Sequence, residues 1–329
     1  MLSLVVLNYN GKKLLKTCLD SLLKQSFTDK EVIFLDNAST DDSVAFVRAS
    51  YPGVRVVVNE KNTGYAGGAN KAVEISRGEF VMILNPDIVL EPDYVEVLVA
   101  AMAGDSKIAS AIGKLRVYDF EKGEKTNRID SAGLVMYRNR RCVDRGQGEE
   151  DKGQFDTREE VFGVTGACPL YRRSALEDVR VAGEYFDSDF FMYKEDVDLS
   201  WRFLLFGWKA LYEPAAVGYH GRGTGAVTRG GVVEVASRRK DLSKFQRHYS
   251  YKNERLMRVK NEFGANVVHD LFPILGKEIM MLGWTCVREP FLFKSLVEFF
   301  KQLPRAREKR REIISRRKIG SQEMQQWFK

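Results

Sequence analysis

The sequence predicts an α/β fold followed by a helical C-terminal region. Two observations support the α/β part: short apolar runs alternate with helical patterns in the first third of the chain, and each run ends abruptly in polar residues. A third observation sets the C-terminal region apart, because it is basic and its apolar residues repeat at helical spacing. Alternating strands and helices with short connections indicate a parallel sheet with right-handed crossovers.

The expected elements follow in chain order. A first strand at residues 2–7 is followed by leucines at helical spacing in residues 12–25, and a second strand at 31–35 precedes Thr40 and Asp41, either of which can cap the next helix. Later apolar runs predict strands at residues 54–58, 80–84, 108–117 and 161–168. A helix at 197–206 is apolar nearly all round, so we expect it to be buried.

The run at residues 80–84 is the element around which we expect a site. It stops on Asn85-Pro86-Asp87, which places a carboxylate just beyond the strand's C-terminal end, where ligands bind in open α/β sheets. Asp87 and the neighbouring amide oxygen of Asn85 offer hard ligands suited to Mg²⁺ or Mn²⁺ bound together with substrate phosphates. The alternative is an ordinary turn that caps the helix starting near Pro92.

The other strand ends also suit a nucleotide. No Gly-x-Gly-x-x-Gly follows the first strand and no Walker A lysine motif is present. Tyr9 has a face that can stack on a base, and Asp36 can accept hydrogen bonds from a base or ribose, although a buried tyrosine and an Asx turn explain them as well. Gly64, Gly67 and Gly68 permit close approach of a diphosphate to a helix N-terminus, or form a flexible loop.

Composition limits the class of protein. The chain has 329 residues, 44% of them hydrophobic, enough for one large core or two moderate ones. Its four cysteines show no paired or metal-finger spacing, which favours a reducing compartment. The chain begins in an apolar strand without a basic leader, so a signal peptide is not expected, and no apolar run reaches the ~18 residues of a spanning helix.

The net charge of +7 is unevenly distributed. Residues 238–329 carry 22 basic and 10 acidic residues, whereas the preceding part carries 30 basic and 35 acidic ones. Residues 291–303 place apolar side chains on one helical face, and residues 305–318 are strongly basic, a pattern typical of a helix lying in a membrane surface. The alternatives are helices packed on the α/β part of the chain or on a second subunit. Nucleic-acid binding is less suited, because no binding motif is present.

An acidic pair and a histidine add chemistry to the middle of the chain. Glu195 and Asp196 begin the helix at 197–206, and a packed helix holds a catalytic carboxylate rigidly. Alternatively, these acids only favour the helix N-terminus electrostatically. His220 is flanked by glycines and therefore expected to be accessible, and Arg222 can neutralise phosphate. A loop histidine without a ligand is the plain alternative.

Five motifs in sequence make the chain resemble a family 2 glycosyltransferase of the GT-A fold. The resemblance covers residues 2 to about 225 and is greatest to the rhamnosyltransferase-like branch, which often has Asn-Pro-Asp in place of Asp-x-Asp. The motifs are VVLNYNG at 5–11, LDNASTD at 35–41, GYAGGAN at 64–70, LNPD at 84–87 and YKEDVDLSWR at 193–202.

The resemblance implies a Rossmann-like half with a mixed sheet, and a role for each motif residue. Asp196 matches the family's general base, with Glu195 beside it, and Asp87 and His220 match the binding site for Mg²⁺ or Mn²⁺. We expect Asp87 and Asp196 to approach a bound donor from opposite sides of one cleft. The residues expected to bind the nucleotide sugar are Asn8, Tyr9, Asn10, Asp36, Asn37, Gly64, Gly68, Asn70, Asn85 and Arg222.

Together these inferences predict a catalytic domain at 1–237, divided into a nucleotide-binding half at 1–103 and an acceptor half at 104–237. A helical region at 238–329 follows. The expected reaction is inverting transfer from a nucleoside-diphosphate sugar, first dTDP-rhamnose, to a polysaccharide or lipid-linked glycan at the cytoplasmic face of a membrane. Alternatives are another UDP- or GDP-linked hexose or N-acetylhexosamine, a non-catalytic scaffold, or a nucleic-acid binder. A homo-oligomer also fits.

Overall fold

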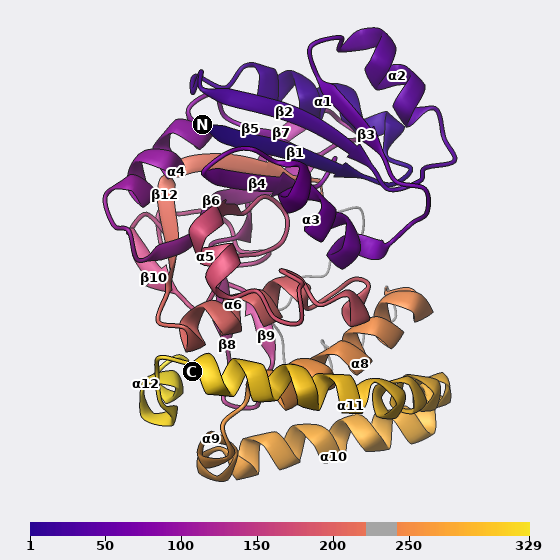
Figure 1. Cartoon of the computed structure of the whole chain (residues 1–329), viewed down its shortest axis with the longest axis vertical. Coiled ribbons are helices and arrows are strands. Elements are labelled where there is room, and N and C mark those ends of the chain that lie inside the picture. Colours follow the sequence, from indigo (N-terminus) through magenta and orange to yellow (C-terminus); the bar gives the residue numbers. More distant parts are fainter. Residues whose placement is uncertain (222–241) are drawn as a thin grey trace.

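A mixed β-sheet forms the centre of the molecule (Figure 1). The computed structural model describes residues 1–221 and 242–329. The strand order is β10-β12-β6-β11-β4-β1-β2-β3, with β5 paired to β12 and β7 paired to β6. The N-terminal half of this sheet is parallel and consists of β1 (Leu2–Asn8), β2 (Lys30–Asp36), β3 (Arg55–Val58) and β4 (Phe80–Leu84).

The four strands predicted for this half are confirmed, with bounds that differ by at most one residue at either end. Every residue of β1 and β4 is buried, as expected of parallel strands with both faces covered. The helices between the strands are α1 (Lys12–Leu23), α2 (Ser43–Ser50) and α3 (Gly64–Ile75). The parallel registers place Asn8 beside Asp36, so the polar residues after β1 and β2 meet at one edge of the sheet.

The second half of the sheet is mixed. Strand β6 (Ile108–Asp119) pairs in parallel with β12 (Lys209–His220) and antiparallel with β11 (Leu170–Arg172), which joins it to β4. Helix α4 (Tyr94–Ala103) packs against β6 and β12. The remaining elements are β5 (Ile88–Leu90), β7 (Glu124–Ser131), β8 (Leu134–Met136), β9 (Cys142–Asp144), β10 (Glu159–Val161), α5 (Arg173–Asp178) and the 3₁₀ helix η1 (Ser188–Phe190).

The strand predicted at residues 161–168 is wrong. Strand β10 ends at Val161 and β11 begins at Leu170, so the small-residue run between them is a loop. Its backbone makes contacts that a ladder would not allow: the Gly166 N–H binds the Asp196 carboxylate, and the Gly166 carbonyl accepts from Tyr65. The apolar character of the run reflects burial of Val164 and Cys168, which local patterning cannot distinguish from a strand.

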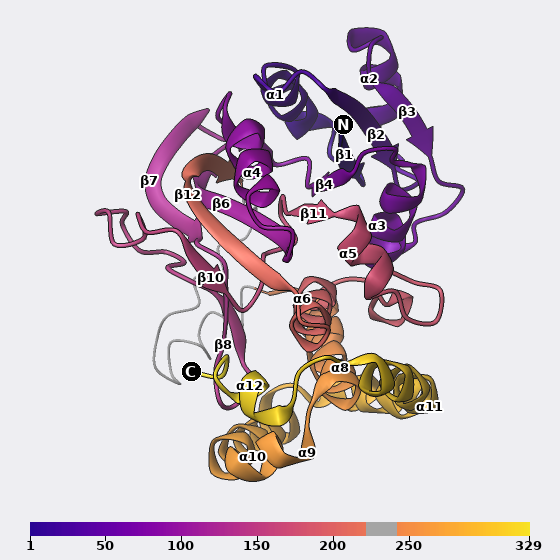
Figure 2. The same ribbon diagram turned by 60° about the vertical axis from the view of Figure 1, so that its left-hand side comes forward.

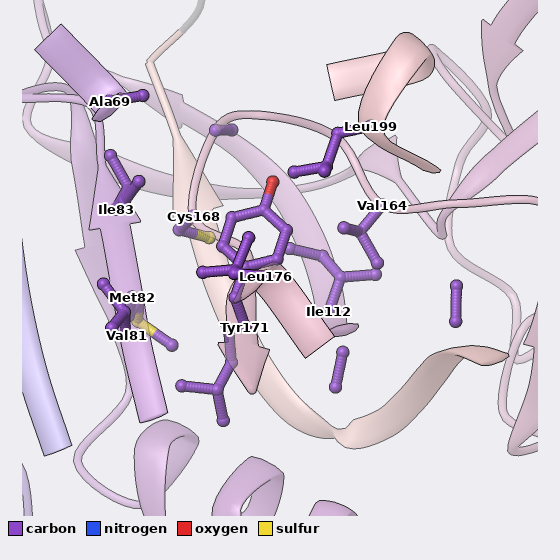
Figure 3. Packing of buried hydrophobic residues seen from close by; sticks show 14 of the residues in the cluster. Ala69, Val81, Met82, Ile83, Ile112, Val164, Cys168, Tyr171, Leu176 and Leu199 are labelled. Atoms are coloured by element: carbon purple, nitrogen blue, oxygen red, sulfur yellow. The ribbon is translucent and has the colours of Figure 1, made fainter. Parts of the chain in front are cut away.

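Part of the core lies between the sheet and α6 (Glu195–Leu205). Figure 3 shows Tyr171 of β11 standing among Met82 and Ile83 of β4, Cys168, and Leu199 of α6. All of these side chains are fully buried or nearly so. The expectation of a buried helix after the acidic pair is confirmed, because residues 197–205 of α6 are all buried. Helix α6 is therefore packed along its whole length, which fixes the position of its N-terminal end.

The C-terminal region is a group of helices beneath α6 (Figure 2). Helix α8 packs against α6 and α11, and α9 packs against α10 and α12. None of the helices in the described ranges has both the length and the hydropathy needed to cross a bilayer. The bounds are α8 (Lys244–Asn261), α9 (Gly264–His269), α10 (Leu271–Arg288), α11 (Phe293–Arg316) and α12 (Ser321–Gln325).

Buried ion pairs tie these helices to the rest of the molecule. Lys260 of α8 lies 2.6 Å from Asp187 and 2.8 Å from Asp198 of α6, and Lys309 of α11 lies 2.6 Å from Asp187. Burial favours the neutral acid, but the two lysines outweigh it and hold the Asp187 pKa well below its usual range. One face of the C-terminal helices is therefore committed to contact with the sheet-bearing part of the chain.

Candidate active site

A cavity of about 510 Å³ opens where the strand ends, the loop at 162–169 and the start of α6 meet. Its volume lies within the range usual for small-molecule sites. Asp87, His220, Glu195 and Asp196 all line it, although more than a hundred residues separate Asp87 from Asp196. The expectation that Asp87 and Asp196 share one cleft is confirmed by this arrangement.

Strand pairing brings Asp87 and His220 together. Strand β5 pairs antiparallel with the end of β12, in a register that sets His220 opposite Ile88, and the Gly221 N–H donates to the Asp87 carbonyl at 2.8 Å. The His220 Nε2 and Asp87 Oδ1 atoms are 3.3 Å apart. On its other side, His220 Nδ1 lies 2.8 Å from Oδ2 of Asp130 in β7. The imidazole is thus held between two carboxylates.

This enclosure changes both the exposure and the ionisation of His220. The glycine-flanked position predicted an accessible histidine, but the residue is only 7% exposed because the two carboxylates and β12 surround it. Burial lowers the His220 pKa, but Asp87 and Asp130 overcome this effect and raise it to about 10. Burial also raises the Asp87 pKa, and the charge of His220 brings it below the ordinary value. Without a metal, the pair is therefore a salt bridge at neutral pH.

The donor set fits two positions of a divalent-cation site. Asp87 and His220 both line the cavity, and Asp130 binds the other imidazole nitrogen, as carboxylates commonly do to orient a histidine that ligates a metal. Within residues 1–221 and 242–329, no three His, Cys, Asp or Glu residues group in a way that could hold a metal. Mg²⁺ and Mn²⁺ commonly take one or two protein ligands and complete their shell with substrate phosphates. We therefore assign Asp87 and His220 as candidate ligands.

Asp130→Asn is expected to weaken Mn²⁺ binding. Loss of the carboxylate removes the charge that orients His220, and such changes typically cost about 10–100-fold in metal affinity. The measurement is a titration of free Mn²⁺ by electron paramagnetic resonance in the presence of a nucleoside diphosphate. Asp119→Asn, at the partly exposed end of β6, is the control and should leave the affinity unchanged. Equal affinities in wild type and Asp130→Asn would exclude this role.

Asp196 is fixed at the other side of the cavity. Its Oδ2 accepts from the Gly166 N–H at 3.0 Å, and its Oδ1 accepts from the N–H of the next residue, Val197, at 2.8 Å. Burial is the main cause that raises the Asp196 pKa, while Lys194 and these N–H groups oppose it. Burial and the neighbouring Asp196 charge raise the Glu195 pKa well above its usual range. Because the Glu195 pKa is raised further, Asp196 is the more readily ionised member of the pair.

A strained segment leads into α6. Phe191, Tyr193 and Lys194 adopt φ values of 60°, 70° and 74°, which are unfavourable for residues other than glycine. The side-chain amide nitrogen of Asn253, on α8, lies within 2.8–2.9 Å of the carbonyl oxygens of Phe190, Met192 and Tyr193. One residue of the C-terminal helices therefore stabilises the conformation that aims Asp196 into the cavity.

The polar residues after β1 and β2 form one hydrogen-bonded cluster. Asn8 donates to Asp36 at 2.9 Å, and Asp36 also accepts from the Ser39 backbone and hydroxyl. The side-chain Oδ1 of Asn10 accepts from the Thr40 N–H at 2.8 Å. Asn8 and Asp36 are fully buried, whereas Tyr9 is 50% exposed and has a free face for stacking. None of these residues lines the 510 Å³ cavity, so the structure places them beside it.

The remaining predicted residues hold loops in position. Asn37 accepts from Thr63 and donates to the Gly64 carbonyl, and Asn70 binds the backbone of residues 185–186. Gly68 packs on Leu7, since an added Cβ would lie 2.6 Å from that side chain. Gly64, at φ +71°, has the Phe191 carbonyl where a Cβ would stand. Asn85 lines the cavity, and Arg222 lies outside the described residues.

Sequence reasoning missed several residues of the site. Tyr65 lines the cavity, and its hydroxyl donates to the Gly166 carbonyl at 2.5 Å, a contact that its place in the glycine motif did not reveal. Lys194 contributes a cation to the wall directly before the acidic pair. Asp130 and Asn253 act on His220 and on the strained segment from distant elements. Only Lys194 had a local signal, namely a basic residue next to two acids.

Comparison with known proteins identifies the family of the chain. The family model described as glycosyl transferase family 2 matches residues 3–180. Poly-beta-1,6-N-acetyl-D-glucosamine synthase of Staphylococcus epidermidis is 26% identical over 219 residues, which is 66% of this chain and 48% of that protein. Chondroitin synthase of Escherichia coli is 34% identical over 124 residues, 37% of this chain and 18% of that protein. The chain thus spans at most about half the length of the curated relatives it matches.

Two solved structures share the fold. The crystal structure of GalNAc-T7 with UDP, GalNAc and Mn²⁺ aligns with a TM-score of 0.60 at 15% identity, over 79% of this chain and 48% of that one. A mannosyltransferase from Pyrobaculum calidifontis in complex with GDP-Man and Mn²⁺ aligns with a TM-score of 0.50 at 18% identity, over 93% of this chain and 75% of that one. The predicted GT-A fold is confirmed, and the chain belongs to glycosyl transferase family 2.

Proposed function

We propose that this chain is an inverting glycosyltransferase that moves a sugar from a nucleoside diphosphate to a glycan hydroxyl. The observation that carries the proposal is the shared cavity, in which Asp196 faces the Asp87–His220 pair. Direct displacement at an anomeric carbon needs one base for the acceptor proton and positive charge near the departing diphosphate. Asp196 would supply the base, and the Asp87–His220 pair would hold the charge near the diphosphate. A non-catalytic scaffold would need neither.

The residues divide the reaction between them. Asp196, ionised and anchored by the Gly166 N–H, takes the proton from the attacking hydroxyl. Burial and the Asp196 charge raise the pKa of the neighbouring Glu195 well above its usual range, so Asp196 is the member of the pair that ionises more readily. Lys194 contributes positive charge to the same wall. Asp87 and His220 would hold Mg²⁺ or Mn²⁺, which would supply charge to the leaving diphosphate.

The nucleotide would lie over the cluster at the ends of β1 and β2. Tyr9 offers its exposed face to a base, and the loops that Asn10 and Asn37 hold lie at the same edge of the sheet. Asn8, Asp36 and Asn70 would act mainly by shaping these loops, because their polar atoms already bind protein groups. Gly64 and Gly68 would permit the approach of α3 to Phe191 and to β1.

We retain dTDP-rhamnose as the first donor to test, on the strength of the Asn85-Pro86-Asp87 sequence. The second candidate is a UDP-linked N-acetylhexosamine, which the names of the poly-N-acetylglucosamine and chondroitin synthases favour. The acceptor would be a polysaccharide or lipid-linked glycan, met at the cytoplasmic face of a membrane. A reducing compartment suits the free cysteines among the described residues, three of which are buried.

A thermal-shift panel of nucleoside-diphosphate sugars tests the proposal. A donor that binds the native state raises the melting temperature, because binding at ~100 times Kd stabilises a protein by about 2.7 kcal/mol. We expect a shift of several degrees for one donor, larger with Mn²⁺ than with EDTA. The same panel on Asp87→Asn should lose the Mn²⁺-dependent part of the shift. No shift with any donor, with or without metal, would reject the proposed function.

A further inference from the structure

The outer face of α10 is apolar along its whole length. Phe272 is 86% exposed, Ile279 69% and Val287 76%, and Leu275 and Leu282 fill the helical turns between them. Helix α11 continues this surface at its N-terminal end with Phe293, Val297 and Phe300. Exposed apolar residues are ordinary when scattered singly, but a continuous stripe on adjoining helices marks a docking surface. We call these eight residues the apolar face.

The charged residues of α10 turn away from the apolar face. Lys277 is largely covered and binds Glu254 of α8, while Glu278 binds Arg255 at 2.8 Å and Arg258 at 2.6 Å. Ile274 and Thr285 are the buried residues of α10, so its contact with the molecule is mixed and its outward side is the more apolar one. This pattern is the reverse of that of a surface helix in a water-soluble protein.

The charge that remains outward at this face is positive. The four carboxylates of residues 264–304, those of Asp270, Glu278, Glu289 and Glu298, each bind a basic or histidine side chain. Lys294 and Lys301 of α11, which flank the apolar residues of that helix, are exposed and have no ion-pair partner in the described part of the chain. Two copies of the chain docked through this face would bring like charges together. An anionic surface would pair with them instead.

Figures 1 and 2 both place α10 at the outer edge of the molecule, at the end opposite α2 and β3. A flat surface could therefore contact α10 and the start of α11 without meeting the sheet. The inward faces of α8 and α11, in contrast, are occupied by the pairs of Lys260 and Lys309 with Asp187. The C-terminal helices thus have one face that contacts the sheet-bearing part of the chain and another without a partner among the described residues.

We propose that the apolar face lies in the interfacial layer of a lipid bilayer, with Lys294 and Lys301 at anionic headgroups. This inference rests on the proposed function in one respect, since it specifies the membrane contact through which a lipid-linked acceptor would be reached. Helices of this kind bind by burying apolar side chains at the headgroup boundary and by attraction to anionic lipid. They do not need to cross the membrane.

Vesicle sedimentation with the full chain tests the proposal. We expect binding to vesicles of phosphatidylcholine with phosphatidylglycerol, weakened by salt, and weaker binding to phosphatidylcholine alone. The double variant Ile279→Glu/Val287→Glu should bind the mixed vesicles at least about tenfold more weakly. Lys294→Glu/Lys301→Glu should lose mainly the salt-sensitive part. Val58→Glu, at a 46% exposed site on β3, is the matched control and should bind as wild type does.

Three results would overturn the proposal: no binding of wild type to the anionic vesicles, undiminished binding of the Ile279→Glu/Val287→Glu variant, or tighter binding of the chain to duplex DNA at the same salt. Sedimentation velocity completes the test, because a wild-type dimer that the same variant converts to monomer would assign the face to a second copy. The donor-induced thermal shift should be equal in wild type and variant. If neither wild type nor variant bound any donor while wild type still bound vesicles, the proposed function would be rejected and the proposed membrane contact would still be supported.

Discussion

Asp196→Asn is expected to lower the rate of sugar transfer by about 10²–10⁴-fold, the range that general-base catalysis contributes. Asparagine can keep the hydrogen bond from Gly166 but cannot take a proton from the acceptor, so the geometry stays while the chemistry is lost. Donor binding should be nearly unchanged, because the candidate metal ligands are Asp87 and His220, and the nucleotide loops do not line the cavity. The measurement combines single-turnover transfer with the donor-induced thermal shift.

Glu195→Gln is the matched control for this prediction. Glutamine has the size of Glu195, which lies next to Asp196 in sequence and lines the same cavity, but burial and the Asp196 charge raise the Glu195 pKa well above its usual range. Replacement by the neutral amide should therefore cost much less than the Asp196 change. If Glu195→Gln were the more damaging substitution, Glu195 would be the base. If neither variant lost activity, the scaffold alternative would replace the catalytic one.

The rate should also depend on pH in a defined direction. Transfer needs the ionised form of Asp196, and burial raises its pKa above the ordinary value of 3.8. The rate is therefore full above the raised pKa and falls as the pH drops through it, at a higher pH than an exposed aspartate would give. The acid limb should be absent from the residual activity of Asp196→Asn. An acid limb that survives the substitution would belong to another group.

The fold was readable from the sequence wherever local pattern and burial agree. The four parallel strands are continuous apolar runs because both faces of the sheet are covered, and the turn at residues 85–87 ends the fourth run sharply. Residues 161–168 show where this reasoning fails. They are apolar because they are buried, as a strand would be, but the Gly166 N–H donates to the Asp196 carboxylate and so cannot pair with a neighbouring strand. That contact comes from a residue thirty positions away in sequence, which periodicity cannot reveal.

The candidate site divides in a similar way. Asp87, Asp196 and His220 are titratable residues at element ends, so their chemistry was visible, and the structure adds only that they share a cavity. The sequence did not indicate that Asp36 and Asn37 would be buried and bound by neighbouring loops. Nor did it indicate the partners of these site residues. Asp130 meets His220 because of the β6–β7 pairing, and Asn253 meets residues 190–193 because α8 packs beneath α6.

Asn253→Ala is expected to reduce transfer by about a hundredfold, because a small misplacement of a catalytic group has costs of this size. The substitution removes the amide that binds the carbonyls of Phe190, Met192 and Tyr193. The strained segment before α6, with its unfavourable φ values, is then held less firmly. Asp196 begins the helix directly after this segment, so its direction depends on it. Asn253 is thus a positioning residue that touches no reacting atom.

A loss of stability must be separated from a loss of positioning. Arg255→Ala is the control, since it removes the pair with Glu278 from the same helix without touching the strained segment. Each substitution should lower the free energy of unfolding by about 1–3 kcal/mol, but only Asn253→Ala should lower kcat, with the KM for donor nearly unchanged. Asn253→Ser, which keeps one donor, should fall between the two. If both alanine variants lose activity in proportion to their melting temperatures, Asn253 only stabilises the fold. A selective loss of kcat would show that a C-terminal helix sets the position of the base, and that the helical region is part of the catalytic machinery.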